Sequence, residues 1–65
     1  MPVVHIYMYA GRTKEQKNEL VKRISKDFED VVNVKSESLN ILFHDTDKED
    51  WGIRGSLASE QTPAR

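Results

Sequence analysis

The residues best suited to chemistry stand at the start of the chain, where Pro2 follows Met1 and leads directly into the stretch Val3–Tyr9. Removal of Met1 would leave Pro2 with a free secondary amine at the head of a rigid strand. An α-amino group has a pKa of about 7.7–8.0, and burial beside a cation lowers it further. A base with a pKa near the working pH can both accept and return a proton. We therefore predict that Pro2 is a catalytic base; the plain alternative is a proline that only begins a strand.

The element that must hold this amine is a strand over residues 3–9, whose side chains are apolar, β-branched or aromatic. Alternation divides these side chains between two faces, Val4, Ile6 and Met8 on one and Val3, His5, Tyr7 and Tyr9 on the other. Both faces are largely apolar or aromatic, which is typical of a sheet covered on both sides. A helix of this chain can cover one face, so the other face predicts a partner subunit.

The next element is a helix, which the capping-box pair Thr13 and Gln16 predicts to begin just after Arg12. An apolar stripe follows at three- and four-residue steps, made of Leu20, Val21, Ile24, Phe28, Val31 and Val32. Charged residues, Lys17 among them, fill the remaining positions and indicate a solvated face. Asn33 is expected to end the helix in the left-handed conformation.

A second strand is expected over Leu39–His44, and the short connections predict a right-handed β-α-β unit with parallel strands. An acidic loop over Asp45–Asp50 follows, and the glycines of Trp51–Leu57 are typical of a tight hairpin or bulge. The polar end of the chain, about residues 60–65, is expected to be frayed. Residues 1–65 are therefore interpreted as a single α+β domain.

Size and composition limit what this domain can do alone. The chain has 65 residues, a formal net charge of −1 and no cysteine. A domain this small buries only about 60% of its unfolded surface, and no disulfide can compensate, so oligomerisation is expected. The near-neutral charge gives no signal for a nucleic-acid or membrane partner. No apolar run reaches the ~20 residues of a membrane span and no signal segment is recognised, so a cytoplasmic protein is expected.

One pattern of motifs runs through the chain: Met1-Pro2 before a strand, Gly11-Arg12-Thr13 and Glu15-Gln16-Lys17 at the helix start, then Trp51-Gly52-Ile53, Gly55 and Leu57-Ala58-Ser59. It resembles the small tautomerases of the 4-oxalocrotonate tautomerase family over all but the last few residues. The resemblance implies the tautomerase fold, a β-α-β unit with parallel strands and a C-terminal β-hairpin that dimerises into a four-stranded sheet. It further implies a homohexamer, a trimer of dimers in which the hairpin laps onto a neighbouring dimer.

The same resemblance implies an activity. Members of the family lose the initiator Met, and the exposed proline nitrogen moves a proton between carbon and oxygen of a 2-hydroxydienoate or an enol-pyruvate. Carried to this chain, Pro2 matches the general base and acid, and Arg12 matches the arginine that binds a substrate carboxylate. Trp51 matches the apolar wall that keeps water from the amine. The partner is then a small carboxylate, and neither a metal nor an organic cofactor is required.

One position departs from the family pattern. Asn40 aligns with a second arginine, which a neighbouring subunit contributes in the prototype. An amide donates hydrogen bonds but brings no charge and no bidentate fork, which counts against efficient use of a doubly charged dicarboxylate. Arg54 in the hairpin is a candidate substitute, and Tyr9 is expected at the pocket wall.

Each of these residues also has a plainer interpretation. Arg12 would otherwise be a surface cation near a helix start, where the helix dipole disfavours it. Trp51 would be a packing residue, Asn40 a partner for backbone groups, and Arg54 a surface or interface charge.

Two other functions stay open, hydration or dehalogenation of a haloacrylate and a non-catalytic oligomeric module. The first needs a water-activating carboxylate near the hairpin, and Ile53 and its neighbours offer none convincingly. His5 and His44 stand on separate strands without a carboxylate at ligand spacing, which favours packing over a metal site. The acidic loop does not fit a calcium loop, because Asp50 and Ser56 stand where Gly and Glu are required.

Overall fold

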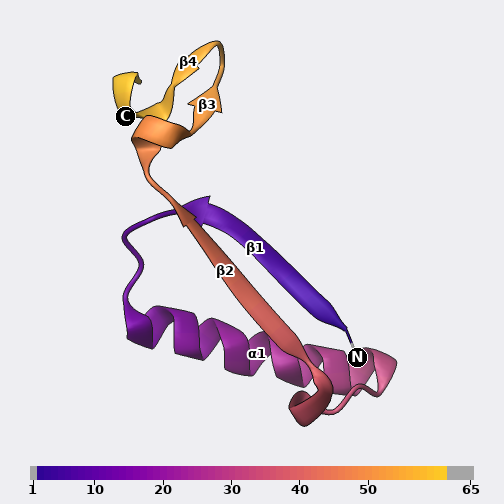
Figure 1. Ribbon diagram of the computed structural model, residues 1–65. Coiled ribbons are helices and arrows are strands. Elements are labelled where there is room, and N and C mark those ends of the chain that lie inside the picture. Colours follow the sequence, from indigo (N-terminus) through magenta and orange to yellow (C-terminus); the bar gives the residue numbers. More distant parts are fainter. Residues whose placement is uncertain (1, 62–65) are drawn as a thin grey trace.

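The computed structural model describes residues 2–61 and consists of a β-α-β unit followed by a small hairpin (Figure 1). The unit contains strand β1 (Val3–Tyr9), helix α1 (Lys14–Val32) and strand β2 (Asn40–Thr46). β1 and β2 pair in parallel, from Val3 opposite Asn40 to Tyr9 opposite Thr46. The predicted α+β unit with parallel strands is confirmed.

The bounds of β2 differ from the predicted strand Leu39–His44. Leu39 instead follows a 3-10 turn, η1 (Ser36–Ser38), and its N–H closes that turn. At the other end the strand continues through residues 45–46 into the predicted acidic loop. It continues because β1 offers a paired neighbour as far as Tyr9, which the local sequence of β2 does not indicate.

Both ends of α1 follow the local sequence signals. The Thr13 hydroxyl accepts the N–H of Gln16 at 3.1 Å, and the Gln16 side chain accepts the N–H of Thr13 at 2.9 Å. Asn33 ends the helix at φ 59° and ψ 37°, and its N–H donates to the Glu29 carbonyl at 3.1 Å. The predicted capping box and left-handed terminator are confirmed.

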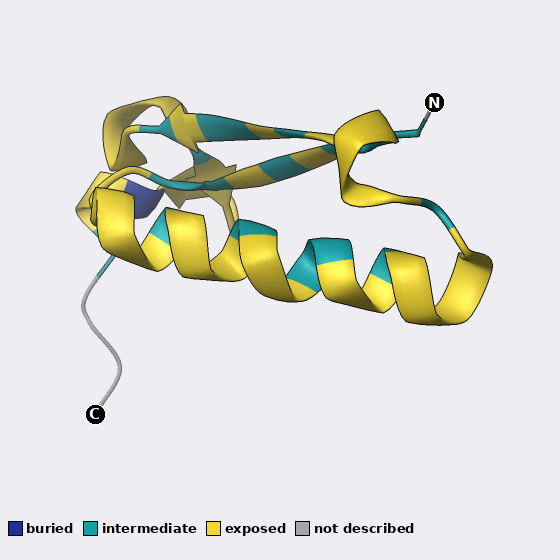
Figure 2. Ribbon diagram, turned by 90° about the horizontal axis from the view of Figure 1, so that it is seen from below, coloured by how far each residue is buried: buried dark blue, intermediate teal, exposed yellow. Residues whose placement is uncertain are grey.

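α1 covers one face of the sheet and leaves the opposite face open (Figures 1 and 2). The covered face carries half-buried side chains, Val4, Ile6 and Met8 of β1 with Ile41 and Phe43 of β2. On the open face Val3, Tyr7 and Leu42 are 49%, 66% and 42% exposed. Among residues 2–61 the one buried hydrophobic side chain is Ala58, at 9% exposure. This chain therefore does not enclose a core of its own.

The predicted apolar stripe and charged face of α1 both need correction. Val31 and Val32, assigned to the stripe, are 80% and 56% exposed and therefore do not belong to the covered face of α1. Lys17, assigned to the solvated face, is half-buried; it forms an ion pair with Asp45 and its ammonium lies 5.7 Å from the centre of the Phe43 ring. Lys17 stands three residues before a stripe position, so helical spacing could have indicated this contact.

Beyond β2 the chain forms an arm that projects from the end of the sheet (Figure 1). It contains the 3-10 turns η2 (Lys48–Asp50) and η3 (Ala58–Glu60) and the strands β3 (Gly52–Ile53) and β4 (Ser56–Leu57). β3 and β4 pair antiparallel, so the predicted hairpin is confirmed. The tip residues have positive φ, 58° at Arg54 and 87° at Gly55, as a two-residue hairpin turn requires.

The end of the described chain closes this arm. Gln61 donates from its side-chain nitrogen to the Ile53 carbonyl at 2.9 Å and to the Ser56 hydroxyl at 2.6 Å. Residues 62–65 of the predicted frayed tail lie outside the described residues. Within residues 2–61, α1 is too polar to pass through a bilayer and no other helix is long enough.

Replacing Thr13 by Ala removes the side-chain acceptor for the Gln16 N–H, and we expect this to lower the free energy of unfolding by about 1 kcal/mol. Thr13→Ser keeps a hydroxyl acceptor and should stay within about 0.5 kcal/mol of the parent. Urea unfolding at one fixed protein concentration, followed by far-UV circular dichroism, measures both differences. Equal losses in the two variants would contradict the capping role.

Candidate functional site

Pro2 and Asn40 lie together where the paired strands begin. Pro2 directly precedes β1 and is half-buried. Its carbonyl accepts the backbone N–H of Asn40 at 3.1 Å, and Asn40 pairs in register with Val3. This hydrogen bond holds the residue whose ring nitrogen is the predicted base. It uses only the backbone of Asn40, whose side chain is exposed.

Tyr9 and Trp51 form an aromatic pair at the opposite end of the strands. Their ring centres lie 4.7 Å apart with the planes at 66°, an edge-to-face contact, and both residues are half-buried. The Lys48 ammonium lies 5.4 Å from the centre of the Tyr9 ring. The Trp51 carbonyl accepts the N–H of Ala58 at 2.7 Å, and this hydrogen bond connects the aromatic pair to the buried residue of the arm.

Arg12 lies at the same end of the sheet, on the side that faces α1. It lines a hollow of about 240 Å³ together with Met8, Gln16, Lys17 and Leu20. Lys17 is already paired with a carboxylate of β2. Among the residues that the structure describes, Arg12 has no salt-bridge partner, so its guanidinium is the charge of this hollow that can bind an anion.

Arg54 lies at the exposed tip of the arm in a backbone conformation that suits glycine better. Its φ of 58° is uncommon for a residue with a Cβ atom and costs about 1–2 kcal/mol. The turn itself therefore does not explain an arginine at this position. Strain of this kind is a reason to look for a role of the side chain.

Within one chain the six predicted site residues do not form a single cluster. Two lie at the start of the parallel strands and four lie at or beyond their end: Pro2 and Asn40, then Tyr9, Arg12, Trp51 and Arg54. A strand of seven residues spans roughly 23 Å, so a small carboxylate cannot reach both ends. The structure brings together Pro2 with Asn40 and Tyr9 with Trp51, and leaves these pairs apart.

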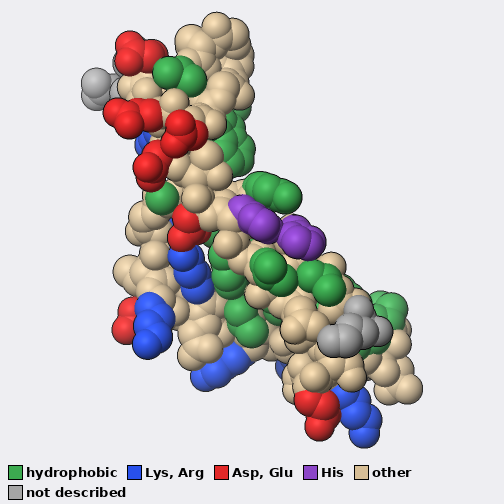
Figure 3. Space-filling view, viewed as in Figure 1, with side chains coloured by type: hydrophobic (Ala, Val, Ile, Leu, Met, Phe, Trp, Pro, Cys, Tyr) green, Lys and Arg blue, Asp and Glu red, His purple; other side chains and the backbone are tan. Residues whose placement is uncertain are grey.

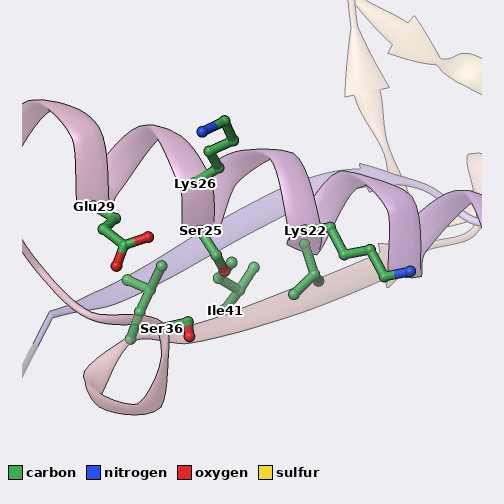
Figure 4. Close-up of a pocket in the computed structure, with 8 residues that line it drawn as sticks. Lys22, Ser25, Lys26, Glu29, Ser36 and Ile41 are labelled. Carbon is green, nitrogen blue, oxygen red and sulfur yellow. The ribbon is translucent and has the colours of Figure 1, made fainter.

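A larger hollow, of about 550 Å³, lies between α1 and the start of β2 (Figure 4). Val21, Leu39 and Ile41 contribute apolar surface, and polar side chains from α1 and η1, such as Lys22 and Glu29, also line it. None of the six predicted site residues lines it. We assign it no chemistry.

Within residues 2–61 there is no cluster of three or more His, Cys, Asp or Glu side chains that could hold a metal ion. His5 and His44, interpreted from sequence as packing residues, contact each other, with Nδ1 of His5 2.7 Å from Nε2 of His44.

Sequence reasoning missed Lys48, the cation that lies against the aromatic pair. The signal was present, because Lys48 is the single basic residue within the acidic stretch 45–50. Its position over the Tyr9 ring depends on where β2 ends, and the predicted strand ended too early to indicate it.

The sequence of this chain is similar to those of known proteins over nearly its whole length. A family model described as tautomerase enzyme matches residues 2–61. A 2-hydroxymuconate tautomerase of Comamonas testosteroni is 37% identical over 60 residues, covering 92% of this chain and 95% of the relative.

Solved structures agree with the sequence match. A structure of 4-oxalocrotonate tautomerase isozymes from Methylibium petroleiphilum superposes with a TM-score of 0.81 at 34% identity, covering 89% of this chain and 94% of that one. A heterohexamer 4-oxalocrotonate tautomerase from Chloroflexus aurantiacus J-10-fl has the same fold, with a TM-score of 0.84 at 24% identity over 95% of this chain and 100% of its own.

Proposed function

This chain belongs to the tautomerase family of enzymes and is an isomerase, and from that premise we propose the reaction and the residues that carry it out. The reaction is an enol–keto proton transfer, a 1,3- or 1,5-shift, on a small 2-hydroxydienoate or 2-keto acid. The 2-hydroxymuconate tautomerase activity of the relative from Comamonas testosteroni supports this substrate class.

Pro2 is the group that moves the proton, once Met1 has been removed. Its nitrogen accepts the hydroxyl proton of the enol while the carbonyl forms, and the resulting ammonium returns a proton to carbon. A secondary ring amine suits this role because its pKa lies near neutral pH and its ring is stiff. The observation that carries the proposal is the half-buried position of Pro2 at the head of β1, with its carbonyl bonded to Asn40.

The site is completed by a second copy of the chain. A two-fold axis across the strands would bring the end of one β1 to the start of the other, and with it Tyr9, Arg12 and Trp51 to the Pro2 of the partner. The separation of the two groups along β1 supports this arrangement, as does the open face of the sheet. We propose a homohexamer of three such dimers, an assembly size that matches the heterohexamer of Chloroflexus aurantiacus.

In this assembly the remaining residues bind the substrate and exclude water. Arg12 binds the carboxylate, and its charge stabilises the dienolate that forms during transfer. Tyr9 and Trp51 form a dry wall, and a dry, positive surrounding lowers the pKa of the Pro2 amine. Asn40 donates a hydrogen bond to a substrate oxygen, and Arg54 reaches the substrate from the arm.

The charge around the arm favours a substrate with one carboxylate over one with two. Acidic side chains gather at this end of the molecule (Figure 3), among them Asp47, Glu49 and Asp50 around η2. Their field opposes a second negative charge on the substrate. Asn40 offers no cation to offset that opposition.

Loss of the free secondary amine of Pro2 should lower the activity. We expect Pro2→Ala to lower kcat with little change in far-UV circular dichroism, because it leaves a flexible primary amine in place of the stiff ring amine. A form that retains Met1 should lose about 10²- to 10⁴-fold in kcat, because its Pro2 nitrogen lies in a peptide bond and general acid–base catalysis contributes that much. Turnover is followed by the ultraviolet absorbance of the dienol. Equal turnover by the Met-bearing and processed forms would overturn the mechanism.

Arg12→Gln should lower kcat/KM about 10- to 100-fold, since a hydrogen bond to a charged group contributes about 1.5–3 kcal/mol. Arg23→Gln provides a matched control, because Arg23 lies on the exposed surface of α1 and pairs with Glu19. The control should keep the parental kcat/KM in the same absorbance assay. Equal effects of the two substitutions would remove Arg12 from the site.

A further inference from the structure

The open face of the β1–β2 sheet carries no Lys, Arg, Asp or Glu side chain, so any charge on it comes from its two histidines. Its residues alternate along the two strands: Val3, His5, Tyr7 and Tyr9 of β1 with Asn40, Leu42, His44 and Thr46 of β2. Figure 3 shows the two histidines side by side on this face, with hydrophobic side chains around them. Asp45, the acidic residue of β2, is paired instead with Lys17 on the side of α1.

His5 and His44 form a hydrogen-bonded and stacked pair at the centre of this face. Nδ1 of His5 lies 2.7 Å from Nε2 of His44, and the two ring centres are 5.0 Å apart with planes at 19°. The Tyr7 ring stacks on His44 from the opposite position in the register, at 4.4 Å and 13°. The three rings therefore form one layer on the open face.

This geometry limits how many protons the pair can hold. A hydrogen bond between two ring nitrogens requires a proton on one nitrogen and a lone pair on the other. The pair can therefore be neutral or singly protonated. A second added proton would put hydrogens on both facing nitrogens, break the bond and set two cations against each other. Histidine is the side chain whose charge ordinarily changes between pH 5 and 8.

The occupant that fits this face is a second copy of the chain. Among the described residues Ala58 is the one buried hydrophobic side chain, so association is the remaining way to bury Val3, Tyr7 and Leu42. With its histidines uncharged the face can meet a copy of itself without like-charge repulsion. We propose that copies of this chain associate through the open sheet face and that double protonation of the His5–His44 pair releases them.

No other titratable group that faces the His5–His44 pair could accept the second proton in place of the two histidines. On the open face the remaining titratable side chains are Tyr7 and Tyr9, and the nearest cation in contact with them is Lys48, 5.4 Å from the Tyr9 ring centre. The charged side chains of α1 lie across the sheet, because α1 packs on the opposite face. Covering the face with another copy removes water as well, which further disfavours a doubly charged pair.

The sign of the effect follows from proton linkage. Separated copies bind more protons than associated ones, so acidification favours dissociation. For each pair that binds one extra proton on release, the dissociation constant of the assembly rises about tenfold for each unit by which the pH falls. This inference rests on the proposed assembly of copies but not on the chemistry of Pro2. The test measures the mass of the assembly in the absence of substrate, so this proposal and the catalytic role of Pro2 can fail independently.

Sedimentation velocity of the full chain from pH 7.5 to 5.0, at constant ionic strength, tests the proposal. The pH range stays above the ordinary pKa of carboxylates, about 3.9–4.3. We expect the average mass to fall as the pH is lowered through this range, and ring ¹⁵N NMR shifts of both histidines to change in the same step. An assembly that persists unchanged to pH 5.0, or ring protonation in a step separate from the change of mass, would overturn the proposal.

Two further variants identify the pair and the face. His5→Gln with His44→Gln places amides that cannot titrate, and this variant should stay assembled at pH 5.0; release over the parental pH range would contradict the proposal.

Leu42→Asp should dissociate the assembly at pH 7.5. Val31→Asp, at an 80% exposed position at the end of α1, should keep the parental mass. A parental mass for Leu42→Asp would show that the open face is not the interface.

Discussion

A single helix can cover only one face of a two-stranded sheet, and the rest of this structure depends on that limit. α1 half-buries Ile6, Ile41 and Phe43 on one side, while Tyr7 and Leu42 remain open on the other. Burying a side chain of that size contributes about 1.5–3 kcal/mol relative to leaving it exposed. The free energy that the chain cannot gain alone is therefore available to association between copies.

The same limit decides where chemistry can occur. The parallel register holds Pro2 beside Asn40 at one end of the sheet and Tyr9 beside Trp51 at the other. Under the proposed mechanism neither pair is a site by itself, since the first lacks a cation and a dry wall and the second lacks the base. Under the same proposal, association would both cover the open face of the sheet and complete the site.

Features encoded by neighbouring residues could be predicted from the sequence. Thr13 with Gln16, Asn33, and the hairpin around Gly55 each depend on contacts within a few positions of the chain. The extension of β2 to Thr46 depends on the distant partner strand, so local patterns did not indicate it. Helical spacing could have placed Lys17 beside the apolar stripe, but its ion pair with Asp45 depends on the fold.

The candidate site shows the same division between local and distant information. Residue types suggested the roles of Pro2, Arg12 and Trp51, and the predicted strand over residues 3–9 already separates Pro2 from Arg12. The position of Trp51 beside Tyr9, at the end away from Pro2, comes only from the structure. The contact between His5 and His44 likewise needs the parallel pairing, since the two residues are 39 positions apart.

The central claim, that each site combines Pro2 of one copy with Arg12 of another, can be tested by mixing two impaired variants. Pro2→Ala and Arg12→Gln chains are unfolded together in equal amounts, refolded, and assayed for turnover of the dienol. Random assembly would restore about a quarter of the sites, because each intact site draws one residue from each kind of chain. Activity no greater than that of the separately refolded variants would contradict a site shared between copies.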